Sequence, residues 1–305
     1  MAIKRSWRST SMRVGVLGVA LLGALSISTA PAGADPGTGS ADPVVPAGTV
    51  VEPAVDCLPS SSRPNPVIVL PGADGTTADT ASQWEVVVSS LRQQGACTLV
   101  FQGGIVNGKR WAGDMPASAR QLEQFVAKVK ATTGAAKVDI VAHSAGSFVA
   151  NYFLKVLGGG AAVHSVALLA PEARGCDGAG FLAQYGLKDL PVTPVQVLQS
   201  APFLLPVLTT LMPDMGPALQ LTPVSEVYRA VMEDGSLTQP GVRYAVIATK
   251  NDAIATPPGT CSFITEPGVT NVFYEDVFPG SPAVDHSSLR SSPDAANWVV
   301  EQLYS

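Results

Sequence analysis

Three residues of this chain have the types and the order that turn a serine hydroxyl into a nucleophile. Ser144 comes first, Asp252 follows it, and His286 comes last. A serine hydroxyl needs a base to take its proton, and that base needs a third group to hold its tautomer. The order serine, acid, histidine is typical of catalytic triads on the loops that follow the parallel strands of an α/β fold. The chemistry indicated is acyl transfer through Ser144.

Ser144 lies between a buried strand and a helix, which is the setting that such a nucleophile requires. The strand ends near Ala142, and the helical spacing of apolar residues begins directly after Gly146. Small residues two before and two after the serine let strand and helix pass closely, and the tight turn exposes the hydroxyl. The backbone N–H of Ala145, at the helix N-terminus, can receive a developing oxyanion. The alternative is a serine in an ordinary tight strand–helix connection, which the flanking strand and helix make less favoured.

Only one of the three histidines has a suitable position for the base. His143 precedes the serine, and His164 falls at the start of a strand, away from the carboxyl ends. His286 lies in a late loop after the last strand, so order and position favour it. His164 is then a structural or surface residue.

The acid is expected in the loop after a late strand. Asp252 stands just beyond the apolar strand at 244–249. The competitors are Asp285, next to the histidine, and Glu275 and Asp276 after the following strand. Asp285 is too close in sequence to orient the ring easily, so Asp252 is preferred.

The elements that position these residues alternate between strand and helix. Apolar runs predict strands at 66–70, 98–101, 137–142, 163–169, 242–249 and 269–274, and helical spacing predicts helices at 84–92, 117–132, 147–154 and 295–303. Such alternation indicates an α/β fold, a mostly parallel sheet with helices on both faces, whose ligands bind beyond the carboxyl ends of the strands. The loop Pro71–Gly75 follows the first strand, so the backbone N–H of Ala73 is the candidate for a second oxyanion donor.

The alternation breaks at about 172–241, which we interpret as an apolar, cap-like insertion over the site rather than a second domain. Prolines interrupt its segment 198–221 too often for one long helix. Its apolar side chains could form a wall that holds an acyl chain, with Phe203, Leu204, Leu208 and Met212 as the pocket residues. The alternative is ordinary core packing beneath a long insertion.

The N-terminal residues have the pattern of an export signal. A basic start is followed by an apolar run at 14–27 that is short for a membrane span, and Ala32-Gly33-Ala34 fits a cleavage site. The pattern predicts a signal peptide at 1–34, a flexible leader at 35–56 and a single domain at 57–305, secreted to the outside or the cell wall after cleavage near Ala34. An uncleaved N-terminal anchor is the alternative. A monomer is expected.

Charge and cysteine content exclude several classes of partner. The chain has 19 basic and 24 acidic residues, and residues 1–34 hold four of the basic ones and no acidic one, so the remainder carries a net charge of −9. This argues against nucleic acid or an anionic membrane as partner. No metal-ligand spacing appears, and no cofactor is expected. Four cysteines in an exported chain suggest two disulfides, for which sequence allows three pairings. Their places beside strands favour Cys57–Cys97 and Cys176–Cys261.

The chain resembles the class 2 type of secreted bacterial triacylglycerol lipases, α/β-hydrolases common in actinomycetes, over about residues 65–303. The resemblance rests on PVIVLPG (66–72), GAAKVDIVAHSAG (134–146), YFLK (152–155), PGVRYAVIATKND (240–252) and the pair Asp285-His286. It implies Ser144 as nucleophile, Asp252 as acid, His286 as base, and the amides of Ala73 and Ala145 as oxyanion donors.

The resemblance implies a serine ester hydrolase that cleaves lipid or other acyl esters and contacts lipid surfaces transiently. This chain departs from the family in having Pro71 in place of a histidine, Ser147 in place of a second glycine, and a more apolar, proline-rich insertion. The alternatives are an acyltransferase or polyester hydrolase with the same triad, or a catalytically inactive binding module. Fold by itself does not decide between them.

Overall fold

A six-stranded parallel sheet forms the centre of the described part of the chain, which in this computed structural model is residues 45–180, 191–232 and 235–305. Across the sheet the strands are β3 (Thr98–Val100), β2 (Val67–Leu70), β5 (Val138–His143), β6 (Val163–Leu169), β7 (Arg243–Ala248) and β8 (Thr270–Phe273). Every neighbouring pair is parallel. Strands β2 and β5 are buried along their whole length, because helices cover both of their faces. The predicted parallel sheet is therefore confirmed, with strand ends close to those expected.

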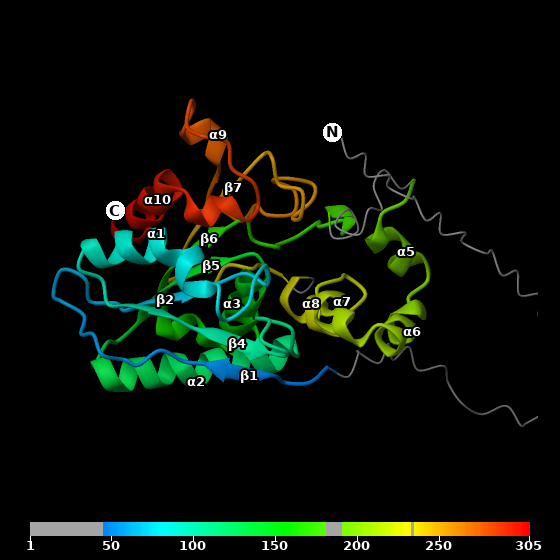
Figure 1. The fold of residues 1–305 in the computed structure, drawn as a ribbon, viewed down its shortest axis with the longest axis horizontal. Helices are drawn as coiled ribbons and strands as arrows, with labels where there is room; N and C mark the ends of the chain where they lie inside the picture. The colour runs from blue at the N-terminus through cyan, green and yellow to red at the C-terminus, as the bar shows by residue number, and fades with distance from the viewer. Residues whose placement is uncertain (1–44, 181–190, 233–234) are drawn as a thin grey trace, which may run out of the picture. The chain divides into compact units, whose positions relative to one another are not determined.

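Two pairs of helices cover the two faces of the sheet. Helices α1 (Thr80–Gln93) and α10 (Pro293–Tyr304) share one core cluster with the sheet, and α2 (Met115–Thr133) and α3 (Ala145–Lys155) share the other. Figure 1 shows α1 and α10 on the side of the strands opposite to α2. Helix α2 begins where the Asp114 carboxylate accepts a hydrogen bond from the backbone N–H of Ala117 at 2.8 Å. The remaining short helices of this part are η1 (Gly159–Ala162), α9 (Tyr274–Val277) and η3 (Ser288–Ser291).

In its described residues the predicted insertion contains short helices, as its prolines indicate. They are α5 (Pro194–Ser200), α6 (Leu204–Leu211), η2 (Pro213–Met215), α7 (Gly216–Gln220) and α8 (Glu226–Met232). In Figure 1 these helices lie beside the sheet rather than on either of its faces. Four buried residues give the insertion a small core of its own: Leu198, Leu205, Leu219 and Val224. The described residues nevertheless form one unit together with the sheet.

Part of the expected leader is a strand. The predicted signal peptide and residues 35–44 of the leader lie outside the described residues. Residues Thr49–Val51 form β1, which pairs antiparallel with β4 (Gln102–Ile105). Glu52, next to this strand, forms an ion pair of 2.7 Å with Lys128 on α2. The end of the leader is therefore attached to the domain.

Two disulfides connect segments that are distant in sequence. Cys57 pairs with Cys97, which directly precedes β3, and Cys176 pairs with Cys261. Both predicted pairings are therefore present. They join cysteines 40 and 85 residues apart, and closing loops of such length stabilises a domain by about 4 kcal/mol each. Within the described ranges, no helix has the length and apolar character that a membrane span requires.

Candidate active site

Ser144 occupies a sharp turn between β5 and α3. Its backbone has φ 50° and ψ −131°, a positive-φ conformation that residues other than glycine rarely adopt. Gly146 allows the close approach that this turn needs, because a Cβ there would lie 2.5 Å from the carbonyl oxygen of Pro71. The turn therefore has the strained geometry expected of a nucleophile at a strand–helix junction.

Ser144, His286 and Asp252 form a continuous chain of hydrogen bonds at the carboxyl ends of the strands. His286 Nε2 lies 2.9 Å from Ser144 Oγ, and His286 Nδ1 lies 2.8 Å from Asp252 Oδ2. All three residues are buried to 95% or more. The structure thus brings together the three residues that the sequence singled out. Along the chain His286 is 34 residues from Asp252 and 142 residues from Ser144.

The acid determines which nitrogen of His286 carries the proton. A carboxylate only accepts hydrogen bonds, so Nδ1–H donates to Asp252 and Nε2 is free to accept from the Ser144 hydroxyl. Burial lowers the pKa of His286, but the hydrogen bond and negative charge of Asp252 outweigh it and raise that pKa above its ordinary value.

The carboxylate of Asp252 is itself held in place by the backbone. Asp252 Oδ1 accepts hydrogen bonds from the N–H groups of Ile254 and Ala255, both at 2.8 Å. Burial raises the pKa of Asp252, but the hydrogen bonds and the positive charge of His286 outweigh it and hold that pKa below its ordinary value. The acid is therefore charged and fixed in orientation.

The competing acids and the competing histidine have other partners. Asp285 accepts hydrogen bonds from the N–H and hydroxyl of Ser288, at 2.7 Å each. Glu275 accepts from the Thr249 hydroxyl, and Asp276 pairs with Lys250. His164 bonds Asp139 at 3.0 Å, where β6 begins, at the opposite end of the strands.

The two backbone N–H groups expected to bind an oxyanion have no hydrogen-bond acceptor among the described residues. Among the hydrogen bonds of the described residues, neither the amide of Ala73 nor that of Ala145 has an acceptor. Ala145 is the first residue of α3, where the helix leaves its N–H groups unpaired. Ala73 belongs to the loop whose Pro71 carbonyl lies against Gly146. Both amides are therefore available to an anionic oxygen.

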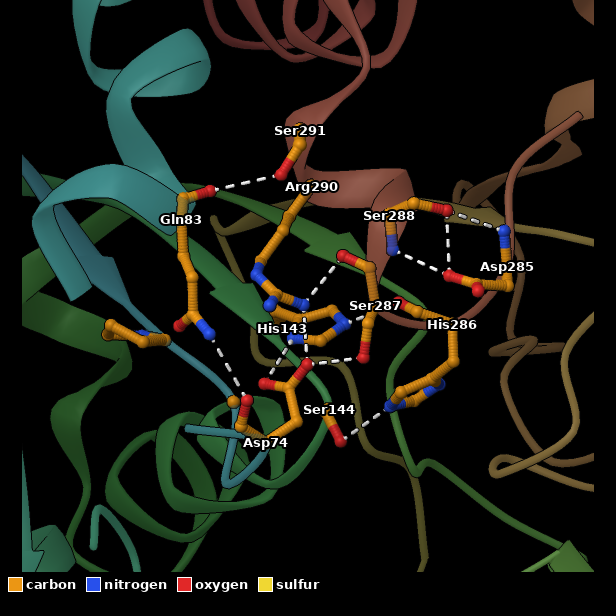
Figure 2. A network of polar contacts seen from close by, with 12 residues as sticks. Asp74, Gln83, His143, Ser144, Asp285, His286, Ser287, Ser288, Arg290 and Ser291 are labelled. Atoms are coloured by element: carbon orange, nitrogen blue, oxygen red, sulfur yellow. Dashed lines mark hydrogen bonds and ion pairs between the residues drawn. The ribbon is translucent and has the colours of Figure 1, made fainter. Parts of the chain in front are cut away.

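A partly buried polar network, which the sequence did not reveal, links this loop to the loop of His286 (Figure 2). Asp74 Oδ2 accepts hydrogen bonds from the hydroxyl of Ser287 and from Arg290. His143 Nε2 lies 2.8 Å from the backbone oxygen of His286, and because that oxygen only accepts, Nε2 donates. Burial lowers the pKa of His143 to about 3, so its ring is neutral. His143, which precedes Ser144, and Asp74 are thus hydrogen-bonded to the loop that carries His286.

A second carboxyl near the triad was also missed. Glu172 stands three residues beyond Leu169, the residue of β6 whose carbonyl accepts from the N–H of Ser144. Burial raises the pKa of Glu172; attraction by His286 opposes this shift, and repulsion by Asp252 adds to it. Its only sequence signal was its place directly after a strand.

The four residues expected to line an acyl pocket differ in their exposure. Phe203 and Met212 are exposed, at 69% and 47% of their surface. Leu204 and Leu208 are half-buried and pack against the core of the insertion. The apolar composition of this segment suggested a wall for an acyl chain, but composition does not show which side chains are buried.

The model of the family described as Lipase (class 2) matches residues 64–173. The similarity to the class 2 lipases is thereby confirmed for the part of the chain that holds Ser144, Ala73 and Ala145. It does not extend to Asp252 or His286. The match supports hydrolase activity on esters. No curated protein is significantly similar to the chain in sequence.

Solved structures agree with this fold. A thermophilic esterase from Thermogutta terrifontis superposes with a TM-score of 0.50 at 15% identity, covering 86% of this chain and 98% of that one. The chain has the α/β-hydrolase fold. An epoxide hydrolase from Vigna radiata (TM-score 0.49, 11% identity, 83% and 93% covered) and an esterase from Pyrococcus furiosus (0.47, 14%, 84% and 89%) are also similar to it. At such low identity, the similarity to these structures concerns the fold and not the substrate.

Proposed function

We propose that this α/β-hydrolase is a secreted serine carboxylic-ester hydrolase that acts on lipid acyl esters. The observation that carries the proposal is the unbroken chain from Asp252 through His286 to Ser144, with distances of 2.8 and 2.9 Å. A nucleophile, a base in the correct tautomer and an oriented acid are the groups that acyl transfer through serine requires.

In the proposed mechanism Ser144 Oγ attacks the ester carbonyl carbon while His286 Nε2 takes the hydroxyl proton. The carbonyl oxygen becomes an oxyanion that accepts hydrogen bonds from the amides of Ala73 and Ala145. The carbon–oxygen bond to the alcohol then breaks, and the imidazolium of His286 gives its proton to the leaving alcohol. Water, activated by the same histidine, attacks the acyl-enzyme and releases the carboxylic acid and Ser144.

Apolar side chains on the outer surface of the insertion support a lipid substrate. Phe203, Val207 and Leu211 are exposed, and a shallow hollow of about 330 Å³ on α6 is lined by Pro206, Val207, Thr210 and Leu211. Clustered exposed apolar residues mark surfaces that bind apolar partners. We propose that this face, together with Leu204, Leu208 and Met212, contacts acyl chains or a neutral lipid surface.

Secretion is supported by the two disulfides, since such bonds persist in oxidising surroundings. It further depends on the signal peptide predicted at 1–34 and on cleavage near Ala34. We propose that the mature protein acts as a monomer outside the cell or at the cell wall.

The test of the proposed function combines turnover with covalent labelling. Purified protein should hydrolyse p-nitrophenyl esters, and an alkyl phosphonate should inactivate it by modifying the peptide that holds Ser144. Cleavage of the ester with transfer of the acyl group to an added alcohol rather than to water would favour the acyltransferase. Absence of both turnover and label would contradict the proposal and leave a binding module.

The preference for acyl chain length is a further prediction of the proposed function. Replacing Phe203 or Leu211 by serine should lower kcat/KM for laurate esters and leave kcat/KM for acetate nearly unchanged. Each methylene that loses an apolar contact costs about 0.8 kcal/mol, or roughly fourfold in kcat/KM. Leu58→Ser is the matched control, because Leu58 is equally exposed but lies beside Cys57, outside the insertion. Equal changes at all chain lengths would mean that this face does not contact the acyl chain.

A further inference from the structure

The loop that carries Ala73 is held by a buried arginine from another part of the chain. Arg110 is only 1% exposed, and its side chain reaches four oxygen atoms. Its Nε–H donates to the carbonyl of Gly72 at 2.9 Å, and its Nη1–H donates to the carbonyl of Thr76 at 2.7 Å. It also donates to the Thr80 hydroxyl and to Gln83 Oε1. The guanidinium thus spans both ends of the loop 72–76.

The first of these bonds fixes the orientation of one peptide plane. Gly72 C=O and Ala73 N–H belong to the same trans peptide, in which the two groups point in opposite directions. Because Arg110 holds the carbonyl of Gly72 on its own side, the N–H of Ala73 must point away from Arg110. This is the amide that lacks an acceptor among the described residues.

The loop 72–76 begins against the turn that carries the nucleophile. Gly72 lies directly against the residue before Ser144, since a Cβ on Gly72 would be 2.5 Å from His143 Nδ1. The neighbouring carbonyl, that of Pro71, lies against Gly146 and accepts a hydrogen bond from Trp111 Nε1. Two consecutive side chains, those of Arg110 and Trp111, therefore hold two consecutive carbonyls of the loop.

Burying a guanidinium is costly, and the ion pair that Arg110 forms with a carboxylate is a long one. The nearest acid, Asp74, has its Oδ1 3.9 Å from Arg110 Nη2, while its Oδ2 is engaged by Arg290 and Ser287. A neutral donor could satisfy one loop carbonyl, but only the planar fork of arginine reaches Gly72 and Thr76 together in a fixed geometry.

We propose that Arg110 is a positioning residue of the oxyanion hole, which fixes the Gly72–Ala73 peptide so that the Ala73 N–H faces the oxyanion formed on Ser144. The inference rests on the proposed function and deepens it. Arg110 does not contact the reacting atoms; it acts through the peptide that does. Its place in a loop far from the elbow in sequence explains why no motif revealed it.

The test compares Arg110→Met and Arg110→Lys with the matched control Arg120→Met, whose side chain is 55% exposed on α2. The readouts are kcat and KM for a p-nitrophenyl ester, the affinity for an alkyl boronic acid, and the pH profile. A boronic acid forms a tetrahedral adduct on the serine, with one oxygen in the oxyanion hole, so its affinity reports the hole directly.

Arg110→Met should lose roughly 10²-fold in kcat and a similar factor in boronate affinity, which is the usual effect of losing one oxyanion donor. Its KM and the pH of its acid limb should stay close to wild type, because Ser144, His286 and Asp252 keep their contacts. Arg110→Lys should fall between, since one ammonium cannot hold both carbonyls, and Arg120→Met should match wild type.

A folded Arg110→Met with wild-type kcat and boronate affinity would overturn the inference. If that variant does not fold, the same result in Arg110→Lys overturns it. A loss of kcat that comes with a shifted pH profile and unchanged boronate affinity also overturns it, because Arg110 would then act on the triad. A wild-type protein inert to esters and phosphonate would instead contradict the proposed function itself.

Discussion

Ser144→Ala and His286→Ala are each expected to reduce ester hydrolysis by roughly 10⁴-fold or more while leaving the fold intact. The first removes the only hydroxyl at the strained turn after β5, and the second removes the acceptor 2.9 Å from it. Combining the two changes should cost little more than either alone, since nucleophile and base act as one unit. The measurement is kcat/KM with a p-nitrophenyl ester, alongside thermal unfolding.

Two matched controls separate the site from its surroundings. His164→Ala removes a histidine that also bonds an aspartate, Asp139, but does so at the far end of the strands. Ser147→Ala removes a buried serine three residues after the nucleophile. Both should keep activity within several-fold of wild type. Phosphonate label on another serine, or an active Ser144→Ala protein, would refute the assignment of Ser144.

The sheet and the turn at Ser144 could be predicted because their signals are local. Strands β2 and β5 are short apolar runs buried on both faces, and Ala142 and Gly146 stand at the two positions where the turn demands small residues. Chain order then indicated His286 and Asp252, since the carboxyl ends of parallel strands meet at one edge. The structure places these side chains within hydrogen-bonding distance of one another.

The polar network around the loop 72–76 could not be predicted, because it depends on contacts between distant segments. Asp74 meets Ser287 and Arg290, which are more than 200 residues away in sequence. Arg110 lies in a loop with no periodicity, and a lone arginine is ordinarily a surface residue. Only the fold shows that it is buried against Gly72.

The exposure of individual side chains in the insertion could not be predicted from the sequence either. An apolar, proline-rich segment predicts short helices, and α5 to α8 are short helices. Hydrophobicity alone does not say which residues of such helices face inward: Leu205 is fully buried, whereas Leu211 on the same helix is 73% exposed. The strand at Thr49–Val51 was missed for a different reason: its pairing partner β4 lies far along the chain.

Asp252→Asn is expected to lower kcat by about 10⁴-fold, although it changes one atom. Asp252 Oδ1 accepts from the N–H groups of Ile254 and Ala255. The single oxygen of asparagine must stay there to keep those bonds, so its NH₂ group faces His286 Nδ1. Donation from that group leaves the ring proton on Nε2, where the ring can no longer accept the proton of Ser144.

The pH profile of this variant tests the same argument in a second way. Asp252 raises the pKa of His286 above its ordinary value, and the base works only when deprotonated. Wild-type kcat/KM should therefore fall as the pH drops through that raised pKa. In Asp252→Asn the pKa of His286 is lower, so the residual activity should fall only at a lower pH than in the wild type. Asp285→Asn is the matched control, because Asp285 adjoins His286 in sequence but bonds Ser288. If Asp285→Asn is the inactive variant and Asp252→Asn keeps its rate, the acid has been assigned to the wrong residue.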